Sequence, residues 1–384
     1  MDTQNTPLHI KIWRREFWFM AFANLFLMMS LYMLIPALPA HMIQEGFSLQ
    51  QTAAVLGIYG IGVYALGGFC SYLVQKYRRN RVCLYAIGGV ALSAAALYYT
   101  EIILGMSLEY WMLLIIRLVQ GALLGLAQMT LSSTLVIDTC ESFQRTEANY
   151  TASWFSRVAL AAGPFLSVWL SKWLEYGFIL LTSCGMAVLA LLLILSVKFP
   201  FKAPSDSLQR FSFDRFFLPQ GLPLFANLLI IMTIVGGILS GPHTLTFYAM
   251  WIIGYVYAIL AEKIAFADAE LKSEVITGLV LFGAALLIAK YHPSEYLVPA
   301  MFGFGTGIIG SRFLLFFIKL AKHCQRGTSQ STFFLAWESG IALGLFLGLQ
   351  CTAHTLDCCL ALTVIALVLY NFFVHPWYLK NRNR

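Results

Sequence analysis

Charged residues are scarce in this sequence. Only 11% of its 384 residues are Asp, Glu, Lys or Arg, and 59% are hydrophobic, whereas a soluble domain carries about 25% charged residues. So few charges cannot cover the water-facing surface of a chain of this length. The composition therefore excludes a soluble globular protein and indicates that lipid surrounds most of the chain.

Motifs for enzymatic chemistry and nucleotide binding are also lacking. The sequence contains no Walker loop, no HExxH zinc motif and no GxSxG nucleophile elbow. Its eight cysteines are scattered without the CxxC spacing of a metal site, and we interpret them as small core residues. We therefore expect no enzyme, no catalytic residue, no metal site, no cofactor and no direct use of ATP by this chain.

Long apolar runs are what the sequence has instead. Runs of roughly 18 or more residues recur from end to end, and each can cross about 30 Å of hydrocarbon. Because these runs are continuous and do not alternate with a period of two, they predict helices rather than a β-barrel. We expect an all-α integral membrane protein of twelve transmembrane helices, at approximately 16–40, 51–74, 82–100, 109–135, 148–171, 175–197, 220–241, 243–263, 274–290, 297–320, 329–350 and 354–374.

The basic residues predict the orientation of these helices. In the twelve-helix layout Lys and Arg gather on one side, and only Lys172 and Lys290 fall on the other. Cytoplasmic loops carry such an excess of Lys and Arg, so both termini are predicted to be cytoplasmic. This topology explains the net charge of +7, and we expect no nucleic-acid partner.

The longest connection between predicted helices runs over 198–218. It contains a stretch with Pro, Ser and dispersed charge, which is typical of a linker. The sequence thus predicts an N-terminal six-helix half at 1–197, a cytoplasmic linker at 198–218 and a C-terminal six-helix half at 219–384. A short repeat around Trp154 and Trp337 agrees with two halves.

The fourth predicted helix carries the most specific pattern. Arg117 is followed by Gln120, Gly121 and Gly125 in the order RxxQGxxxG. The glycines allow a neighbouring helix to approach closely, and the arginine must project inward because a charge facing lipid is costly. Together with six plus six helices and a basic central loop, this pattern resembles the major facilitator superfamily over essentially the whole chain. The resemblance implies a secondary transporter with the major facilitator fold, in a bacterial inner (plasma) membrane.

The fifth predicted helix resembles a second motif of that family in part. Gly163 and Pro164 resemble the Gly-Pro centre of a motif that the family's exporters carry, although the first glycine of that motif is replaced by Ala159. The alternative interpretation is a proline-kinked membrane helix that packs through small residues.

The loop after the second predicted helix carries a basic cluster. Its members are Gln75, Lys76, Arg78, Arg79 and Arg81. They lie where the family has its GxLaDrxGrr loop, whose acidic residue holds the outward-facing state against a helix dipole. Here Gln75 stands at the place of that acid and Arg78 at the place of a glycine, so the resemblance does not extend to this latch. The alternative role of the basic residues is to fix the topology.

Four ionisable residues lie well inside predicted helices, namely Arg117, Arg157, Arg312 and Glu338. Each is costly in hydrocarbon unless it is paired or faces water, so we expect them to line the central cavity or to brace one helix against another. Glu338 is the only carboxylate deep within a predicted helix, which makes it the candidate for carrying a proton between the two faces. The alternative is that Glu338 is a fixed ion-pair partner of Arg157 or Arg312.

Polar residues on the cavity-lining helices are the expected substrate contacts. The resemblance implies that the first, fourth, seventh and tenth helices line the cavity, and the candidates there are Asn24, Tyr32, Gln120, Gln128 and Asn227. The eighth predicted helix adds three aromatic candidates, Tyr248, Trp251 and Tyr255. The alternative role of such aromatic residues is packing or contact with lipid.

The leading functional hypothesis is secondary active transport by alternating access. Its favoured form is an efflux antiporter, which exports a small organic molecule and uses the proton gradient as its energy source. We expect a small-molecule substrate, a lipid bilayer as the surroundings and a monomeric protein. The alternatives are proton-coupled uptake of a nutrient such as a sugar, and a transport-inactive structural or sensing homologue.

Overall fold

The computed structural model describes residues 15–105, 109–132, 145–197, 209–264, 272–322 and 325–382, and these ranges contain helices and no strand. The helices before the central connection are α1 (Arg15–Tyr32), α2 (Leu34–Gln44), α3 (Leu49–Gly62), α4 (Gly67–Lys76), α5 (Arg79–Tyr98), α6 (Tyr110–Thr130), α8 (Arg145–Ser171) and α9 (Tyr176–Leu195). Those after it are α10 (Leu222–Leu239), α11 (Leu245–Ile264), α12 (Ser273–Tyr291), α13 (Leu297–Leu320), α14 (Arg326–Gln350), α15 (Thr355–Leu369) and α16 (His375–Asn381). The described residues also contain the short helical segments η1 (Tyr99–Ile103), η3 (Pro219–Gly221), η5 (Thr352–His354) and η6 (Tyr370–Val374).

Each of the twelve predicted ranges coincides with helical structure, but some of them are divided. The first range forms α1 and α2, which meet at Met33, and the last forms α15 and η6, after which α16 continues beyond the predicted end. The second forms α3 and α4, whose axes differ by 45°. Just after this bend, Gly67 and Gly68 at the start of α4 leave room for aromatic rings of residues 209–218.

The number of membrane spans agrees with the prediction except at one helix. Among the described residues, ten helices are long and apolar enough to cross a membrane, or eleven when the bent pair α3 and α4 counts as one span. The remaining helix, α8, has 27 residues, enough for about 40 Å at 1.5 Å per residue. Its polar residues, among them the buried Arg157, Ser153 and Ser167, lower its apolar content. A span at α8 stays a prediction.

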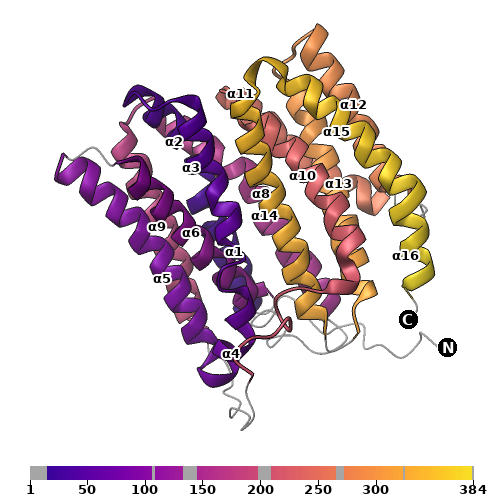
Figure 1. The fold of residues 1–384 in the computed structure, drawn as a ribbon, viewed down its shortest axis with the longest axis horizontal. Coiled ribbons are helices and arrows are strands. Elements are labelled where there is room, and N and C mark those ends of the chain that lie inside the picture. The colour runs from indigo at the N-terminus through magenta and orange to yellow at the C-terminus, as the bar shows by residue number, and fades with distance from the viewer. Residues whose placement is uncertain are drawn as a thin grey trace.

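The helices pack in two groups (Figure 1). In the first group α1 contacts α8 and α9, α3 contacts α6, and α5 contacts α6 and α9; in the second α10 contacts α14 and α15, and α13 contacts α11 and α12. The groups meet where α3 contacts α14 and α8 contacts α11. Of the predicted linker, 198–208 lies outside the described residues, and the domain boundaries stay a prediction.

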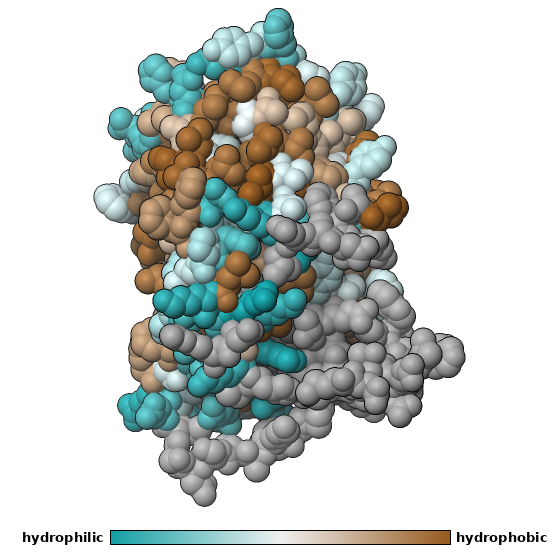
Figure 2. Space-filling view, turned by 90° about the vertical axis from the view of Figure 1, so that its right-hand side faces the viewer, coloured by the Kyte–Doolittle hydropathy of each residue, from teal (hydrophilic) through white to brown (hydrophobic). Residues whose placement is uncertain are grey.

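The bundle has two ends, which we name by the chain termini. The terminal side is the end where α1 begins and α16 ends, at the bottom of Figure 1, and the distal side is the opposite end. In Figure 2 apolar residues form a broad band across the upper and middle part of the face, with hydrophilic residues above and below it. Such a band fits the hydrocarbon layer of a bilayer.

The predicted topology is tested by cysteine labelling in sealed cells. Cys351 is exposed on the distal side, so a variant that retains only this cysteine is expected to react with a membrane-impermeant maleimide from outside. Tyr77 is exposed in the turn between α4 and α5, and Tyr77→Cys in a cysteine-free chain is expected to react only after the cells are opened. Labelling of Tyr77→Cys from outside would overturn the orientation derived from the basic residues.

Candidate functional site

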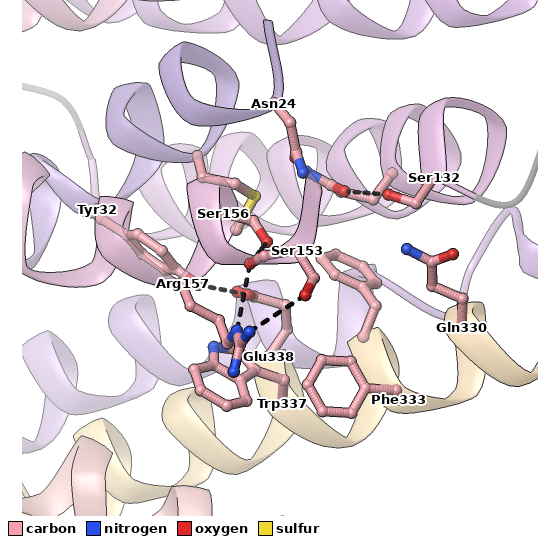
Figure 3. Close-up of a pocket in the computed structure, with 13 residues that line it drawn as sticks. Asn24, Tyr32, Ser132, Ser153, Ser156, Arg157, Gln330, Phe333, Trp337 and Glu338 are labelled. Atoms are coloured by element: carbon pink, nitrogen blue, oxygen red, sulfur yellow. Dashed lines mark hydrogen bonds between the residues drawn. The ribbon is translucent and has the colours of Figure 1, made fainter. Parts of the chain in front are cut away.

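A buried carboxylate joins the two groups of helices. Glu338 lies in the middle of α14 and is 0% exposed. Its Oε2 atom accepts a hydrogen bond of 3.0 Å from the Tyr59 hydroxyl of α3, and its Oε1 atom accepts one from the Tyr32 hydroxyl of α1. Figure 3 shows Tyr32 and Glu338 pointing toward one another. Both donors belong to the first helix group, whereas the acceptor belongs to the second.

Neither arginine proposed as an ion-pair partner of Glu338 has that role in this structure. Arg312 pairs with Glu274 at the start of α12, with 2.8 Å between Nε and Oε2. Arg157 donates instead to the Ser311 hydroxyl at 2.7 Å and to the Gly307 carbonyl at 3.1 Å. The fixed ion pair is therefore wrong for this conformation, because Arg312 bonds to Glu274 of α12 and Arg157 bonds to acceptors on α13 and on its own helix α8.

Arg117 extends the site into the first helix group. It is 2% exposed, its Nη1 atom donates to Gln120 Oε1 at 2.8 Å, and its guanidinium lies 5.1 Å from the centre of the Tyr59 ring. Its Nε atom has no hydrogen-bond partner among the described residues. Arg117, Tyr59 and Glu338 thus form a continuous chain of contacts, in which the ring stabilises the cation and its hydroxyl binds the carboxylate.

Two glycines of the RxxQGxxxG pattern make these contacts of Arg117 and Tyr59 possible. A Cβ atom at Gly121 would lie 2.1 Å from the Tyr59 carbonyl oxygen, and one at Gly125 would lie 2.3 Å from that of Val63. Any larger residue would push α6 away from α3. The predicted close approach of helices is therefore confirmed, and it is what brings Arg117 against Tyr59.

Gly163 has a similar relation to Tyr32. A Cβ atom at Gly163 would lie 3.0 Å from Tyr32 Cβ and 3.1 Å from the Met29 carbonyl oxygen, so α8 packs tightly on α1 at this level. Pro164 lies inside α8, which continues without a break to Ser171. Gly163 thus lets α8 pack against the part of α1 that carries Tyr32, a hydrogen-bond donor of Glu338.

A second set of contacts joins α8 to the second helix group. The Arg157 guanidinium lies 4.0 Å from the centre of the Trp154 ring and reaches from α8 to Ser311 on α13. About two turns earlier in α8, nearer the terminal side, Tyr150 donates to Glu262 of α11. With the Glu338 contacts, these bonds close the terminal side of the bundle.

A small cavity of about 30 Å³ lies beside Glu338. Three of the expected substrate contacts, Asn24, Tyr32 and Gln128, line it, and Gln128 Nε2 donates to Asn24 Oδ1 at 2.6 Å. Asn227 lines neither this cavity nor the larger one described next. Its amide donates to the Ala366 carbonyl at 3.0 Å, so it fastens α10 to α15.

A large cavity of about 1140 Å³ lies between the two helix groups on the distal side. His41 and Tyr176 line it from the first group, with ring centres 3.9 Å apart, and His243 and Phe247 line it from the second, 3.7 Å apart. Its volume exceeds the usual range for a drug-sized ligand. The structure is therefore open to the distal side and closed on the terminal side.

The basic cluster lies on the terminal side, where α4 ends and α5 begins. Gln75 donates to the Ser71 hydroxyl at 3.0 Å, and Lys76 donates to the Tyr72 hydroxyl at 2.7 Å. Arg78 precedes α5, and Arg79 and Arg81 lie in its first turn. This position is compatible with the topological role, and nothing brings the cluster to Glu338.

Sequence reasoning missed Tyr59 and Glu274. Tyr59 is one of eighteen tyrosines. Only its contacts with Arg117 and Glu338 distinguish it from the others, and both of these residues are distant from it in the sequence. Glu274 lies in the first turn of α12, where an acid is ordinary. No local sequence pattern therefore predicts that Glu274 is the partner of Arg312.

Known proteins share both sequence features and fold with this chain. Residues 20–345 match the Major Facilitator Superfamily. No curated protein matches the sequence. A bacterial homologue of the human lysosomal transporter Spinster, in an inward-facing and unoccupied conformation, aligns with a TM-score of 0.68 and 13% identity over 96% of this chain and 98% of that one.

Two other transporters have a similar fold. An auto-inhibited peptide transporter of the POT family aligns with a TM-score of 0.68 and 11% identity over 96% of this chain and 97% of that one. The nucleoside transporter NupG aligns with a TM-score of 0.65 and 13% identity over 94% and 99%. Since the family match covers most of the sequence and the structures agree in fold, the chain belongs to the Major Facilitator Superfamily.

Proposed function

We propose that this chain exports a small organic molecule by alternating access, in exchange for protons. Family membership supports secondary transport in general. The observation that carries the proposal is the position of Glu338, a buried carboxylate whose hydrogen-bond donors, Tyr32 and Tyr59, both come from the opposite helix group. A proton on this carboxylate changes a contact that holds the two groups together.

The chemistry of the contact depends on the charge of Glu338. An ionised carboxylate accepts bonds from both hydroxyls, and such charge-assisted bonds are about twice as strong as neutral ones. Once protonated, one of its oxygens becomes a donor and no longer accepts in the same way. Protonation therefore weakens the hold of α14 on α1 and α3, and loss of the proton restores it.

A transport cycle follows from this switch. In the conformation open to the distal side, a proton from outside reaches Glu338 and loosens its bonds to Tyr32 and Tyr59. The helix groups then separate on the terminal side, where the proton leaves to the cytoplasm and the substrate binds. The ionised carboxylate recaptures both tyrosines, closes the terminal side and returns the substrate to the distal cavity. Protons move down their gradient and the substrate moves out.

The distal cavity supports an amphiphilic substrate. Its lining combines apolar side chains such as Ile35, Leu349 and Phe247 with polar ones such as His41 and Ser240. A wall of this mixed character suits a ligand that has both apolar and polar parts. We propose that the protein works as a monomer in a bacterial inner membrane with both termini in the cytoplasm, and that it needs no cofactor.

Vesicle transport tests this proposal. Inside-out membrane vesicles that contain the protein are energised with a proton gradient, acidic inside, and a panel of amphiphilic drugs and sugars is added one by one while a dye reports the internal pH. A substrate of an antiporter is expected to dissipate the gradient and to accumulate inside. Accumulation in right-side-out vesicles alone would replace export by uptake, and no movement of any compound in either orientation would favour the transport-inactive alternative.

A further inference from the structure

A segment of the central connection lies across the terminal side of the bundle. Residues 209–218, which we call the strap, precede η3 and α10 directly. The strap contacts α14 of the second helix group and α4 of the first.

Two threonines of α14 bind the strap. Thr328 donates from its hydroxyl to Asp214 Oδ1 at 3.2 Å and accepts a hydrogen bond of 2.8 Å from the Arg215 amide. One turn further along α14, the Thr332 hydroxyl accepts from the Leu218 amide at 2.7 Å. Because α14 begins at Arg326, the Asp214 carboxylate lies at the positive end of the helix dipole, where a negative charge is stabilised.

The same carboxylate reaches the first helix group. Asp214 Oδ2 accepts a hydrogen bond of 3.3 Å from the Ser71 hydroxyl of α4. The Ser212 amide adds a bond of 3.0 Å to the Gly68 carbonyl. Asp214 thus binds α4 with one oxygen and α14 with the other, and these helices belong to different groups.

Aromatic rings seat the strap on α4. A Cβ atom at Gly67 would lie 2.1 Å from the Phe216 ring, and one at Gly68 would lie 2.1 Å from the Phe211 ring. Only glycine leaves room for these rings. The surface of α4 at Gly67 and Gly68 therefore fits the rings of the strap, and it lies just beyond the bend between α3 and α4.

The strap backbone is held in an uncommon conformation at one point. Arg215 has a φ of +59°, which few residues other than glycine adopt. This turn directs the Asp214 carboxylate and the Arg215 amide to the same hydroxyl of Thr328. Such a conformation persists where the surrounding contacts determine it strongly.

We propose that the strap locks the terminal side closed, and that Asp214 is the residue that ties α4 to α14. Since the strap continues into α10, it is covalently part of the second group, and its contacts with α4 are the ones that must break when the terminal side opens. Release of the strap is then a step in every cycle. The proposal does not depend on Glu338, on protons or on the direction of transport.

The strap also accounts for the glutamine in the basic loop. Gln75 donates to the Ser71 hydroxyl at 3.0 Å, and that hydroxyl donates to Asp214. The negative charge near the first turn of α14 therefore comes from the central connection and not from the loop between α4 and α5. An acid at position 75 would place a second negative charge beside Asp214.

Distances between spin labels across the distal cavity test the lock. Leu174 and Thr352 line this cavity from the two helix groups, and Leu174→Cys with Thr352→Cys is labelled in a chain without its native cysteines. Purified protein is measured at one pH, without substrate or gradient. In Asp214→Asn we expect the ratio of terminally open to distally open molecules to rise about threefold to tenfold, as for loss of a hydrogen bond to a partly exposed charge. The signature is a larger population of short distances.

A second variant and two controls make the outcome decisive. Phe216→Ala removes the ring that sits on Gly67 and is expected to shift the distances in the same direction, so it serves as the test if Asp214→Asn does not fold. Glu109→Gln, at an exposed distal carboxylate, and Phe178→Ala, at an exposed ring of α9, are expected to leave the distances unchanged. An unchanged distance distribution in folded Asp214→Asn or folded Phe216→Ala would overturn the lock. Failure of proton coupling in the vesicle experiment would leave this result untouched.

Discussion

Replacing Glu338 with glutamine is expected to abolish gradient-driven accumulation of substrate while exchange of substrate across the membrane continues. The amide keeps the shape of the side chain and can still bond to the hydroxyls of Tyr32 and Tyr59, but it cannot bind and release a proton. In proteoliposomes with an imposed proton gradient, accumulation should fall at least about tenfold, which corresponds to about 1.4 kcal/mol of coupling free energy. Counterflow without a gradient should remain.

The tyrosine donors provide a second test of the same switch. Tyr59→Phe removes one hydrogen bond to Glu338 and leaves the carboxyl group in place, so it is expected to favour opening on the terminal side at every pH. Tyr370→Phe is the matched control, because the Tyr370 hydroxyl is buried without a hydrogen-bond partner among the described residues. For the Glu338→Gln variant described above, accumulation of substrate with an unchanged pH dependence would eliminate Glu338 as the proton carrier.

Arg117→Ala is expected to abolish transport and to leave the protein folded. The substitution removes the cation beside the Tyr59 ring and the donor to Gln120, so the ring that holds Glu338 loses its support. We expect the transport rate to fall about a hundredfold, which corresponds to about 2.7 kcal/mol. Arg117→Lys should also transport poorly, since a point ammonium cannot replace a planar guanidinium at a stacked site.

The controls separate this role from packing. Arg117→Met keeps the length of the side chain without its charge, and size-exclusion chromatography reports whether each variant is folded. Arg81→Ala removes an exposed arginine of α5 and is expected to transport as the natural chain does. Full transport by Arg117→Ala or Arg117→Met would reduce Arg117 to a packing residue.

The helices could be predicted from the sequence because each long apolar run is a local signal. The divisions within runs were missed, because the runs stay apolar through Met33 and through the bend after Gly62. At the site, Arg117 and its glycines could be recognised from one stretch of chain. Glu338 could be recognised because no other acid lies so deep in a predicted helix.

The partners of these residues could not be predicted. The sequence indicates Tyr32 only as a substrate contact and does not single out Tyr59, because both tyrosines meet Glu338 across the two helix groups. The central connection was predicted as a linker with dispersed charge, and Asp214 gave no local sign of binding Ser71 and Thr328. Contacts between distant segments depend on the packing of whole helices, which periodicity and composition do not encode.

The backbone contact between α3 and α6 has a mechanical consequence. The second helix group has a counterpart, because a Cβ atom at Gly344 of α14 would lie 2.2 Å from the Thr233 carbonyl oxygen of α10, and one at Gly236 would lie 2.2 Å from that of Ile341. Helices in such contact cannot slip past one another without opening a void, so each pair behaves as a stiff lever. A displacement of Glu338 therefore moves α14 and α10 together, and a displacement of Tyr59 moves α3 and α6 together. The conformational change is then concentrated at the interface between the two helix groups.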